Sequence, residues 1–214
     1  MHIETIIPWE SGKRLGFAIN RAMQKVDEWA LILDHDVFLS LNPLWYQMCL
    51  NAIEKCENPG WITCVTNQIG CPLQKADYSI KKGDYEYSKE YDTNDMEKHF
   101  ELAEIIYKKN MGQVENITEQ ARRWKLSGLF ILTPRKAYDE VKEKFGFPDD
   151  KFIGWDNYYN DRLLELGYKL YLMKDLYVYH GYKRLWKNEG WGESKEKRNF
   201  DMDALRQLAR QGCY

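Results

Sequence analysis

The sequence predicts one α/β domain in which helices flank a mixed, mostly parallel sheet. Short apolar runs of strand length alternate along the chain with longer segments of helical apolar spacing. This order is typical of a sheet whose faces are covered by helices. The 214 residues are enough for one good-sized domain and too few for two ordinary ones. Since no repeat or linker divides residues 1–214, we expect a single domain.

Strands are predicted where a few apolar residues follow one another between turn signals. The clearest is Trp29–Leu33, a continuous apolar run that stops at Asp34. Runs of this kind suit a strand that is buried on both faces, as in a parallel sheet. The other predicted strands are 3–8, 61–65, 129–133, 168–173 and 176–179.

Helices are predicted where apolar residues recur at three- and four-residue spacing. Asn42-Pro43 is a typical helix start, because Asn caps the end and Pro fits the first turn. A later amphipathic helix, 95–109, should bury Phe100, Ala103 and Ile106. The remaining predicted helices are 13–26, 43–56, 134–145, 155–166 and 201–210, and residues 74–91 are expected to form a long polar loop.

Composition and charge exclude several classes of function. The chain carries 31 basic and 33 acidic residues, so nothing indicates a nucleic acid partner. No apolar run approaches the roughly 18–20 residues that a membrane span needs, and residues 1–10 do not resemble a signal peptide. Five cysteines without CxxC spacing indicate free thiols in a reducing compartment, so we expect a cytoplasmic protein.

Asp34 and Asp36 are the most informative residues, because they directly follow the buried strand 29–33. Ligands of open α/β sheets bind outside the carboxyl ends of the strands. Carboxylates at such a place suit Mg²⁺ or Mn²⁺, which proteins hold through one or two acids together with substrate phosphates. The alternative interpretation is a pair of solvated acids at a strand-to-turn junction.

Six short motifs occur in an order that resembles the GT-A fold glycosyltransferases, especially family 2 and the related polypeptide sugar transferases. The resemblance covers roughly residues 12–183 and rests on the motifs together. They are Gly16–Asn20, Asp34-His-Asp36, Ser127-Gly128, Gly154-Trp-Asp156, Arg162-Leu-x-x-x-Gly167-Tyr168 and Val178-Tyr-His180. The resemblance implies a GT-A-like, Rossmann-related domain, with a donor- and metal-binding half at 1–73 and an acceptor-side half at 74–182.

The resemblance also implies residue roles on the donor side. Asp36 corresponds to the metal-binding second aspartate, and Asp34 to the first, which meets the metal or the donor ribose. His180 corresponds to a late histidine that completes the metal site. Asn20 corresponds to a position near the donor nucleotide. For His180 the alternative is an ordinary histidine at a strand end.

On the acceptor side, Ser127-Gly128 resembles a small-residue turn that lets the donor sugar and the acceptor approach the backbone. Asp156 resembles the acid that serves as general base in inverting members, where a carboxylate accepts the proton of the attacking hydroxyl. A plain acid in the first turn of a helix is the alternative for Asp156.

Two departures from the family pattern stand out. About 33 residues precede Asp34, so the fold is expected to be abbreviated at its N-terminus, with Pro8-Trp9 taking over base binding and Trp9 stacking on the base. The family usually has two adjacent acidic residues (Glu-Asp) at the position of the base. Here the sequence is Trp155-Asp156-Asn157, so the second acid that usually accompanies an inverting mechanism is missing. The tail 183–214 is expected to act as an active-site lid.

The sequence therefore predicts a metal-dependent glycosyltransferase that uses Mn²⁺ or Mg²⁺ and a UDP- or GDP-sugar. Its acceptor would be a glycan, a lipid-linked molecule or a protein. Two alternatives remain open. A metal-dependent nucleotidyltransferase would share the carboxylate chemistry but should carry a Gly-rich phosphate loop, and a non-catalytic carbohydrate-binding module would use the aromatic surface.

Overall fold

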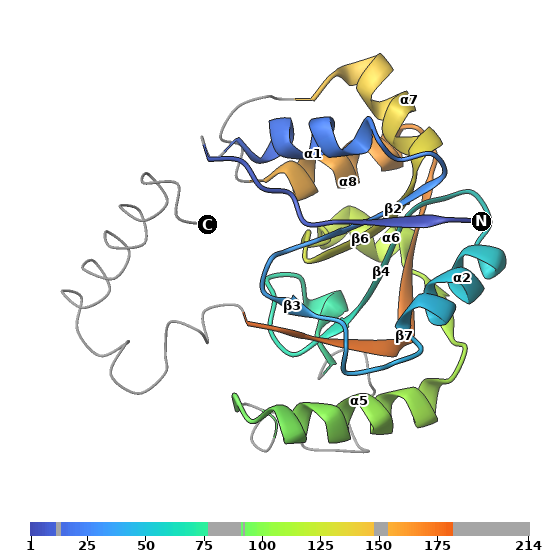
Figure 1. Cartoon of the computed structure of the whole chain (residues 1–214). Helices are drawn as coiled ribbons and strands as arrows, with labels where there is room; N and C mark the ends of the chain where they lie inside the picture. Colours follow the sequence, from blue (N-terminus) through green and yellow to red (C-terminus); the bar gives the residue numbers. More distant parts are fainter. Residues whose placement is uncertain (12–13, 77–90, 92, 148–153, 182–214) are drawn as a thin grey trace.

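The computed structural model describes residues 1–11, 14–76, 91, 93–147 and 154–181 (Figure 1). These residues form an α/β fold built on a seven-stranded mixed sheet, as predicted. Its strands are β1 (Ile3–Ile6), β2 (Trp29–Leu33), β3 (Val37–Phe38), β4 (Pro59–Thr66), β5 (Val114–Asn116), β6 (Phe130–Pro134) and β7 (Lys169–His180). The helices are α1 (Leu15–Met23), α2 (Trp45–Lys55), the short 3₁₀ turn η1 (Pro72–Gln74), α5 (Met96–Asn110), α6 (Thr118–Arg123), α7 (Arg135–Phe145) and α8 (Trp155–Glu165).

The sheet is not mostly parallel, which corrects the sequence-based prediction. Its strand order is β1-β2-β6-β4-β7-β3, with β5 also paired to β7. Only the β1–β2 and β4–β7 pairs are parallel among the described strands, and the pairs that involve β6, β3 or β5 are antiparallel. The prediction failed because an apolar run that is buried on both faces is compatible with either strand direction.

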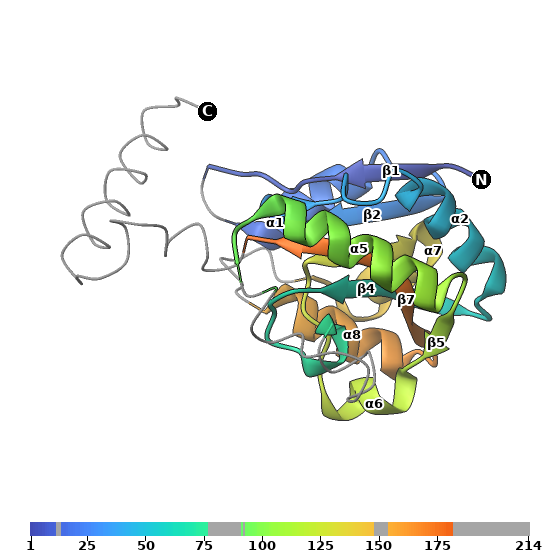
Figure 2. The same cartoon turned by 90° about the horizontal axis from the view of Figure 1, so that it is seen from below.

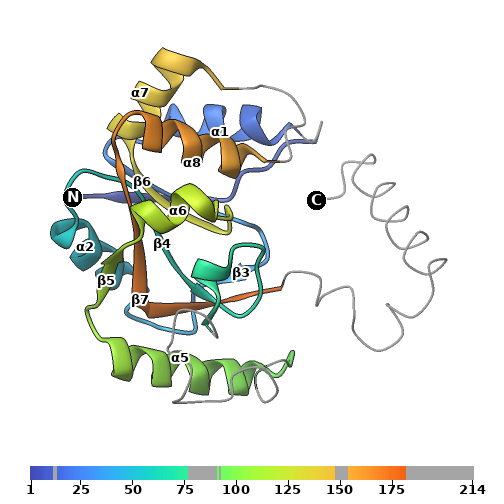
Figure 3. The same cartoon turned by 180° about the vertical axis from the view of Figure 1, so that it is seen from behind.

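Helices cover both faces of the sheet because its central strands are apolar on both sides. Along β2, Ala30 and Ile32 join the core cluster that contains residues of α1, α7 and α8, whereas Leu31 and Leu33 join the cluster that contains residues of α2. Figures 1 and 3 show α1, α7 and α8 together on one side of the sheet, away from α2. The predicted double burial of this strand is confirmed.

The region around β7 differs most from the predicted elements. Two short strands were expected, but β7 is one strand of 12 residues. Its polar residues 174–175 fall at a register shift in the β4–β7 ladder, where the buried Asp175 accepts a hydrogen bond from the backbone N–H of Gly112 at 2.7 Å. Helix α5 packs along β7 and is seen from below in Figure 2. It buries His99, Leu102, Ala103 and Ile106, whereas Phe100, expected inside, is 48% exposed.

Strand direction gathers five segments at one edge of the sheet. β1, β2, β4 and β7 point the same way, so their carboxyl ends lie at this edge. β6 runs the opposite way, and the residues before it therefore lie at the same edge. The sequence motifs at 8–9, 34–36, 127–128 and 180 all follow or precede these strand ends, which is what brings them together.

Among the described residues, no helix combines the length and apolar character that a bilayer span requires. Four cysteines of this part of the chain, Cys49, Cys56, Cys64 and Cys71, are free thiols. The predicted lid at 183–214, the helix at 201–210 and most of the predicted loop at 74–91 lie outside the described residues.

Candidate metal centre

Asp34, Asp36 and His180 converge at the carboxyl edge of the sheet. One potential ligand atom from each lies within 4.8 Å of the others. Nε2 of His180 is 3.3 Å from Oδ1 of Asp36 and 3.8 Å from Oδ2 of Asp34. The three side chains that the sequence assigned to a metal therefore form one cluster, although His180 comes from the other end of the described chain.

Strand pairing explains how the two acids reach this place. Asp34 leaves β2 with its backbone N–H donating to Leu129 O at 3.2 Å, just before β6. The chain then turns into β3, which pairs with the end of β7 so that Val37 lies opposite His180. Next to this pair, the N–H of Gly181 donates to Asp36 O at 2.9 Å. The two-residue strand β3 is thus what fixes Asp36 beside His180.

The imidazole of His180 has a defined orientation. Its side chain is only 3% exposed, and Nδ1 lies 2.9 Å from Gln68 O. A carbonyl oxygen can only accept, so Nδ1 carries the hydrogen and donates it. The other ring nitrogen, Nε2, is left facing the two carboxylates. Histidine ligands of metal ions commonly use this arrangement, in which one nitrogen is held by the protein and the other meets the ion.

The three groups shift one another's pKa values. Burial raises the pKa of Asp34, and the nearby charges of Asp36 and Asp156 act in the same direction against the favourable charge of His180. Burial also disfavours the charged form of Asp36, but its hydrogen bond and charge interaction with His180 outweigh this and lower its pKa. Burial of His180 is likewise outweighed by Asp36, so the pKa of His180 is raised. The cluster therefore holds excess negative charge that a cation would neutralise.

The donor set fits a divalent ion. Two carboxylates suit the hard ions Mg²⁺ and Mn²⁺, and the added imidazole favours Mn²⁺, which accepts mixed oxygen and nitrogen ligation. Exposure decreases from Asp34 (48%) through Asp36 (14%) to His180 (3%). An ion held here would consequently be open to solvent or to a ligand on the Asp34 side.

Asp156 lies next to this cluster, in the first turn of α8. Its Oδ2 accepts from the N–H of Gly128 at 3.0 Å, and its Oδ1 accepts from the N–H of Asn157 at 2.8 Å. Gly128 has no side chain to separate the two residues, and an added Cβ would lie 3.1 Å from the Cβ of Asp156. The motifs at 127–128 and 154–156 are therefore in direct contact.

Gln74 holds the loop that carries Ser127 and Gly128. Its Oε1 accepts from Ser127 N at 2.8 Å, and its Nε2 donates to Ser127 O at 3.0 Å and to Thr63 Oγ1 at 2.8 Å. The Ser127 hydroxyl accepts from Cys71 N at 3.2 Å. Gln74 is fully buried, and sequence reasoning placed it at the start of a polar loop, with no signal for this role.

Asn20, on α1, contacts helix α7. Its Oδ1 accepts a hydrogen bond from the Tyr138 hydroxyl on α7. The structure thus links Asn20 to the helix layer formed by α1 and α7.

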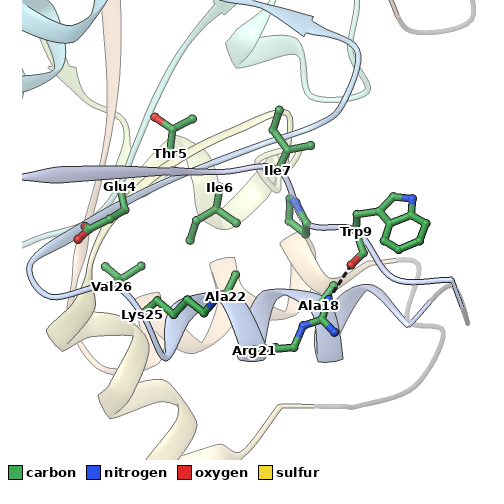
Figure 4. Close-up of a pocket in the computed structure, with 11 residues that line it drawn as sticks. Glu4, Thr5, Ile6, Ile7, Trp9, Ala18, Arg21, Ala22, Lys25 and Val26 are labelled. Carbon is green, nitrogen blue, oxygen red and sulfur yellow. Dashed lines mark hydrogen bonds between the residues drawn. The ribbon is translucent and has the colours of Figure 1, made fainter. Parts of the chain in front are cut away.

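Trp9 lines a pocket of about 550 Å³ between β1 and α1 (Figure 4). Its ring is exposed, and its carbonyl accepts from Nη2 of Arg21 at 3.2 Å. Lys25 and Glu4 also line the pocket. Ile6 pairs with Ile32 in the parallel β1–β2 ladder, and two residues further along the chain, beyond the ends of both strands, are Pro8 and Asp34. Trp9 and Asp34 thus both follow the carboxyl ends of neighbouring parallel strands.

Sequence reasoning missed two amide side chains that support the site: Gln74, and Asn67, which hydrogen-bonds to the backbone N–H and carbonyl of His180. Neither follows an apolar period or a spacing rule, so their roles appear only once the strands are paired. Comparison with protein-family models, with curated proteins and with solved structures finds no match to this chain.

Proposed function

We propose that this protein is a metal-dependent glycosyltransferase, which moves a sugar from a nucleoside diphosphate sugar to an acceptor hydroxyl. The convergence of Asp34, Asp36 and His180 at one sheet edge supports this proposal most directly. The contact between Gly128 and Asp156, whose charge acts on Asp34, adds a candidate base beside that cluster.

In this proposal Asp34, Asp36 and His180 hold Mn²⁺ or Mg²⁺. When bound, such an ion neutralises a diphosphate and makes it a better leaving group. His180 is the last residue of β7, and Asp34 and Asp36 lie in the short turn between β2 and β3, so strand pairing on both sides of the turn sets the position of the ion. The more exposed Asp34 faces the side from which the donor phosphates would approach.

Asp156 is the proposed general base. A sugar hydroxyl is a poor nucleophile, and a carboxylate within hydrogen-bond reach helps by accepting its proton in the transition state. Each oxygen of Asp156 accepts one backbone hydrogen bond, which leaves a second lone pair on each for a substrate hydroxyl. The two backbone bonds also fix the carboxylate in place. This role corresponds to an inverting reaction.

The pocket beside Trp9 is the proposed place for the nucleoside. An exposed indole offers a flat face for a base, and Arg21 holds the backbone that carries it. Because Trp9 and Asp34 follow the carboxyl ends of neighbouring parallel strands, a base beside Trp9 and a diphosphate at the acids are proposed to belong to one ligand. Either a UDP-sugar or a GDP-sugar has this chemistry.

The test measures release of nucleoside diphosphate from UDP- and GDP-sugars by the full chain with Mn²⁺. We expect turnover that depends on the metal and falls at least tenfold in Asp36→Ala. The matched control is Glu104→Ala, which removes an exposed acid on α5 and should leave turnover unchanged. Equal rates for wild type and Asp36→Ala would reject the proposed metal role.

A further inference from the structure

On the side of His180 that faces β4, its backbone hydrogen-bonds to a side chain and not to a neighbouring strand. Oδ1 of Asn67 accepts from His180 N at 2.8 Å, and Nδ2 of Asn67 donates to His180 O at 3.1 Å. The parallel β4–β7 ladder ends at the pair Thr66–Val178. The Asn67 side-chain amide therefore continues the hydrogen bonding of this ladder beyond its last backbone pair. It does so at His180, the proposed metal ligand.

Asn67 is itself fixed. It is 4% exposed, and its Oδ1 also accepts from the hydroxyl of Thr66 at 3.0 Å. Turning the amide over would place its NH₂ against two donors and its oxygen against a carbonyl. The neighbours thus allow one orientation, which is the one that satisfies both backbone groups of His180.

The next residue holds the ring of the same histidine. Gln68 O accepts from Nδ1 of His180 at 2.9 Å. Asn67 and Gln68 consequently fix the main chain and the imidazole together, from the segment that directly follows β4. A side chain at the last residue of a strand needs such support, because strand ends fray more readily than strand centres.

We propose that Asn67 is a positioning residue for a metal ion at Asp34, Asp36 and His180. Asn67 does not contact the ion. It holds His180 so that Nε2 points at the two carboxylates before a metal arrives. This inference rests on the metal centre of the proposed function and names the residue on which the affinity of that centre depends.

The experiment titrates Mn²⁺ into the full-length chain and measures its dissociation constant by calorimetry. Asn67→Ala should bind Mn²⁺ roughly 10–100-fold more weakly than wild type, the usual loss when a residue that orients a metal ligand is removed. The matched control is Asn110→Ala. Asn110 is also buried, and its amide binds Ile106 O at 3.0 Å within α5. Its loss should leave Mn²⁺ affinity within about twofold of wild type.

A milder variant covers the case in which Asn67→Ala does not fold. Thr66→Val keeps the volume and branching of the buried Thr66 but removes the hydroxyl that fixes the Asn67 amide. It should weaken Mn²⁺ binding by a smaller factor, about 2–5-fold, judged from the modest worth of one neutral hydrogen bond.

The outcomes separate this inference from the proposed function. If wild type binds Mn²⁺ and folded Asn67→Ala or Thr66→Val binds it equally well, the positioning role is wrong and the metal centre stands. Equal weakening in Asn110→Ala would also overturn the positioning role, because the loss would then follow from general destabilisation. If wild type does not bind Mn²⁺, the metal centre itself is wrong and the inference falls with it.

Discussion

Nε2 of His180 lies 3.3 Å from Oδ1 of Asp36, and the pair joins the end of β7 to the turn after β2. The contact exists because β3 pairs with the last residues of β7. It sets the protonation of both groups, since His180 lowers the pKa of Asp36 against the effect of burial. A cation that replaces the proton between them would be held by the same geometry.

The first prediction concerns metal-dependent stability. Mn²⁺ at 100 times its dissociation constant should stabilise wild type by about 2.7 kcal/mol, because a ligand of the native state stabilises by RT ln(1 + [L]/Kd). For a chain of this size the shift in Tm is about 5–10 °C. Asp36→Asn should lose most of this shift, since it removes a ligand charge. Thermal melts with and without Mn²⁺ measure it.

Glu104→Gln is the control for this first experiment. It neutralises an exposed acid that is paired with Lys108 on α5 and should keep the full metal-dependent shift. A normal shift in Asp36→Asn would contradict the proposed ligand set.

The second prediction concerns the contact between Gly128 and Asp156. Gly128→Ala places a Cβ 3.1 Å from the Cβ of Asp156, closer than an ordinary contact, so the carboxylate must move. We expect turnover to fall by less than the roughly 100-fold that a 1 Å misplacement can cost, because Asp156 has to shift only by a fraction of that distance. The affinity for Mn²⁺ should not change. Kinetics and metal titration on the same samples separate the two effects.

Gly70→Ala is the matched change for Gly128→Ala. Its added Cβ would lie 3.5 Å from the Ser127 hydroxyl, an ordinary contact, so activity should be retained. If Gly128→Ala and Gly70→Ala have the same turnover, the close contact between Gly128 and Asp156 does not contribute to catalysis.

The sequence predicted strand β2 and the two acids that follow it better than the rest of the site. The apolar run of β2 required burial on both faces, and the acids that follow it could only lie at a strand end. The direction of β6 was not predictable, because its apolar residues fit either direction. It matters nevertheless, since only a reversed strand brings Ser127 and Gly128 to the same edge as Asp34.

The supporting residues were beyond the reach of sequence patterns for a different reason. Asn67 and Gln74 act through side-chain amides that take the place of a strand neighbour. Their partners, His180 and Ser127, are far away in the sequence, and no local spacing connects them. Similarly, β3 has only two residues and no apolar period, although it aligns Asp36 with His180.

The third prediction concerns stability in acid. His99 is fully buried, with Nδ1 accepting from the Tyr177 hydroxyl at 2.8 Å and Nε2 donating to Thr93 O at 2.9 Å. Burial lowers its pKa from the usual 6.5. The unfolded chain therefore binds a proton first as pH falls through 6.5, and the free energy of unfolding decreases from there down to the lowered folded-state pKa.

His99→Gln should flatten this part of the pH dependence, because Gln retains a donor and an acceptor but does not titrate. Urea unfolding at pH 7.5, 6.5 and 5.5 measures the difference between variant and wild type. His180 has a raised pKa and acts in the opposite direction, but it is present in both proteins and cancels in the comparison. The exposed His2, changed to Gln, provides the control. An unchanged slope in His99→Gln would show that burial of this ring does not govern acid stability.

The fourth prediction concerns packing between β4 and α8. A Cβ at Gly60 would lie 2.7 Å from the Cβ of Tyr168 and 2.8 Å from Cδ2 of Leu163. Gly60→Ala should therefore lower the free energy of unfolding by about 1–3 kcal/mol, the usual cost of overpacking. Equilibrium unfolding in urea measures this, and Gly70→Ala should cost much less. A cost within 0.5 kcal/mol of zero, the range typical of surface changes, would mean that the two elements separate easily.

Strand β1 stands at one end of the sheet order, and within the described part of the chain it pairs only with β2. Its one acidic residue, Glu4, lies beside α1 with Oε2 buried and without a hydrogen-bond partner among the described residues. Charges that point inward from an edge strand oppose the addition of further strands. We therefore expect the carboxylate of Glu4 to disfavour the addition of another strand at β1, and an apolar residue in its place to make that addition easier.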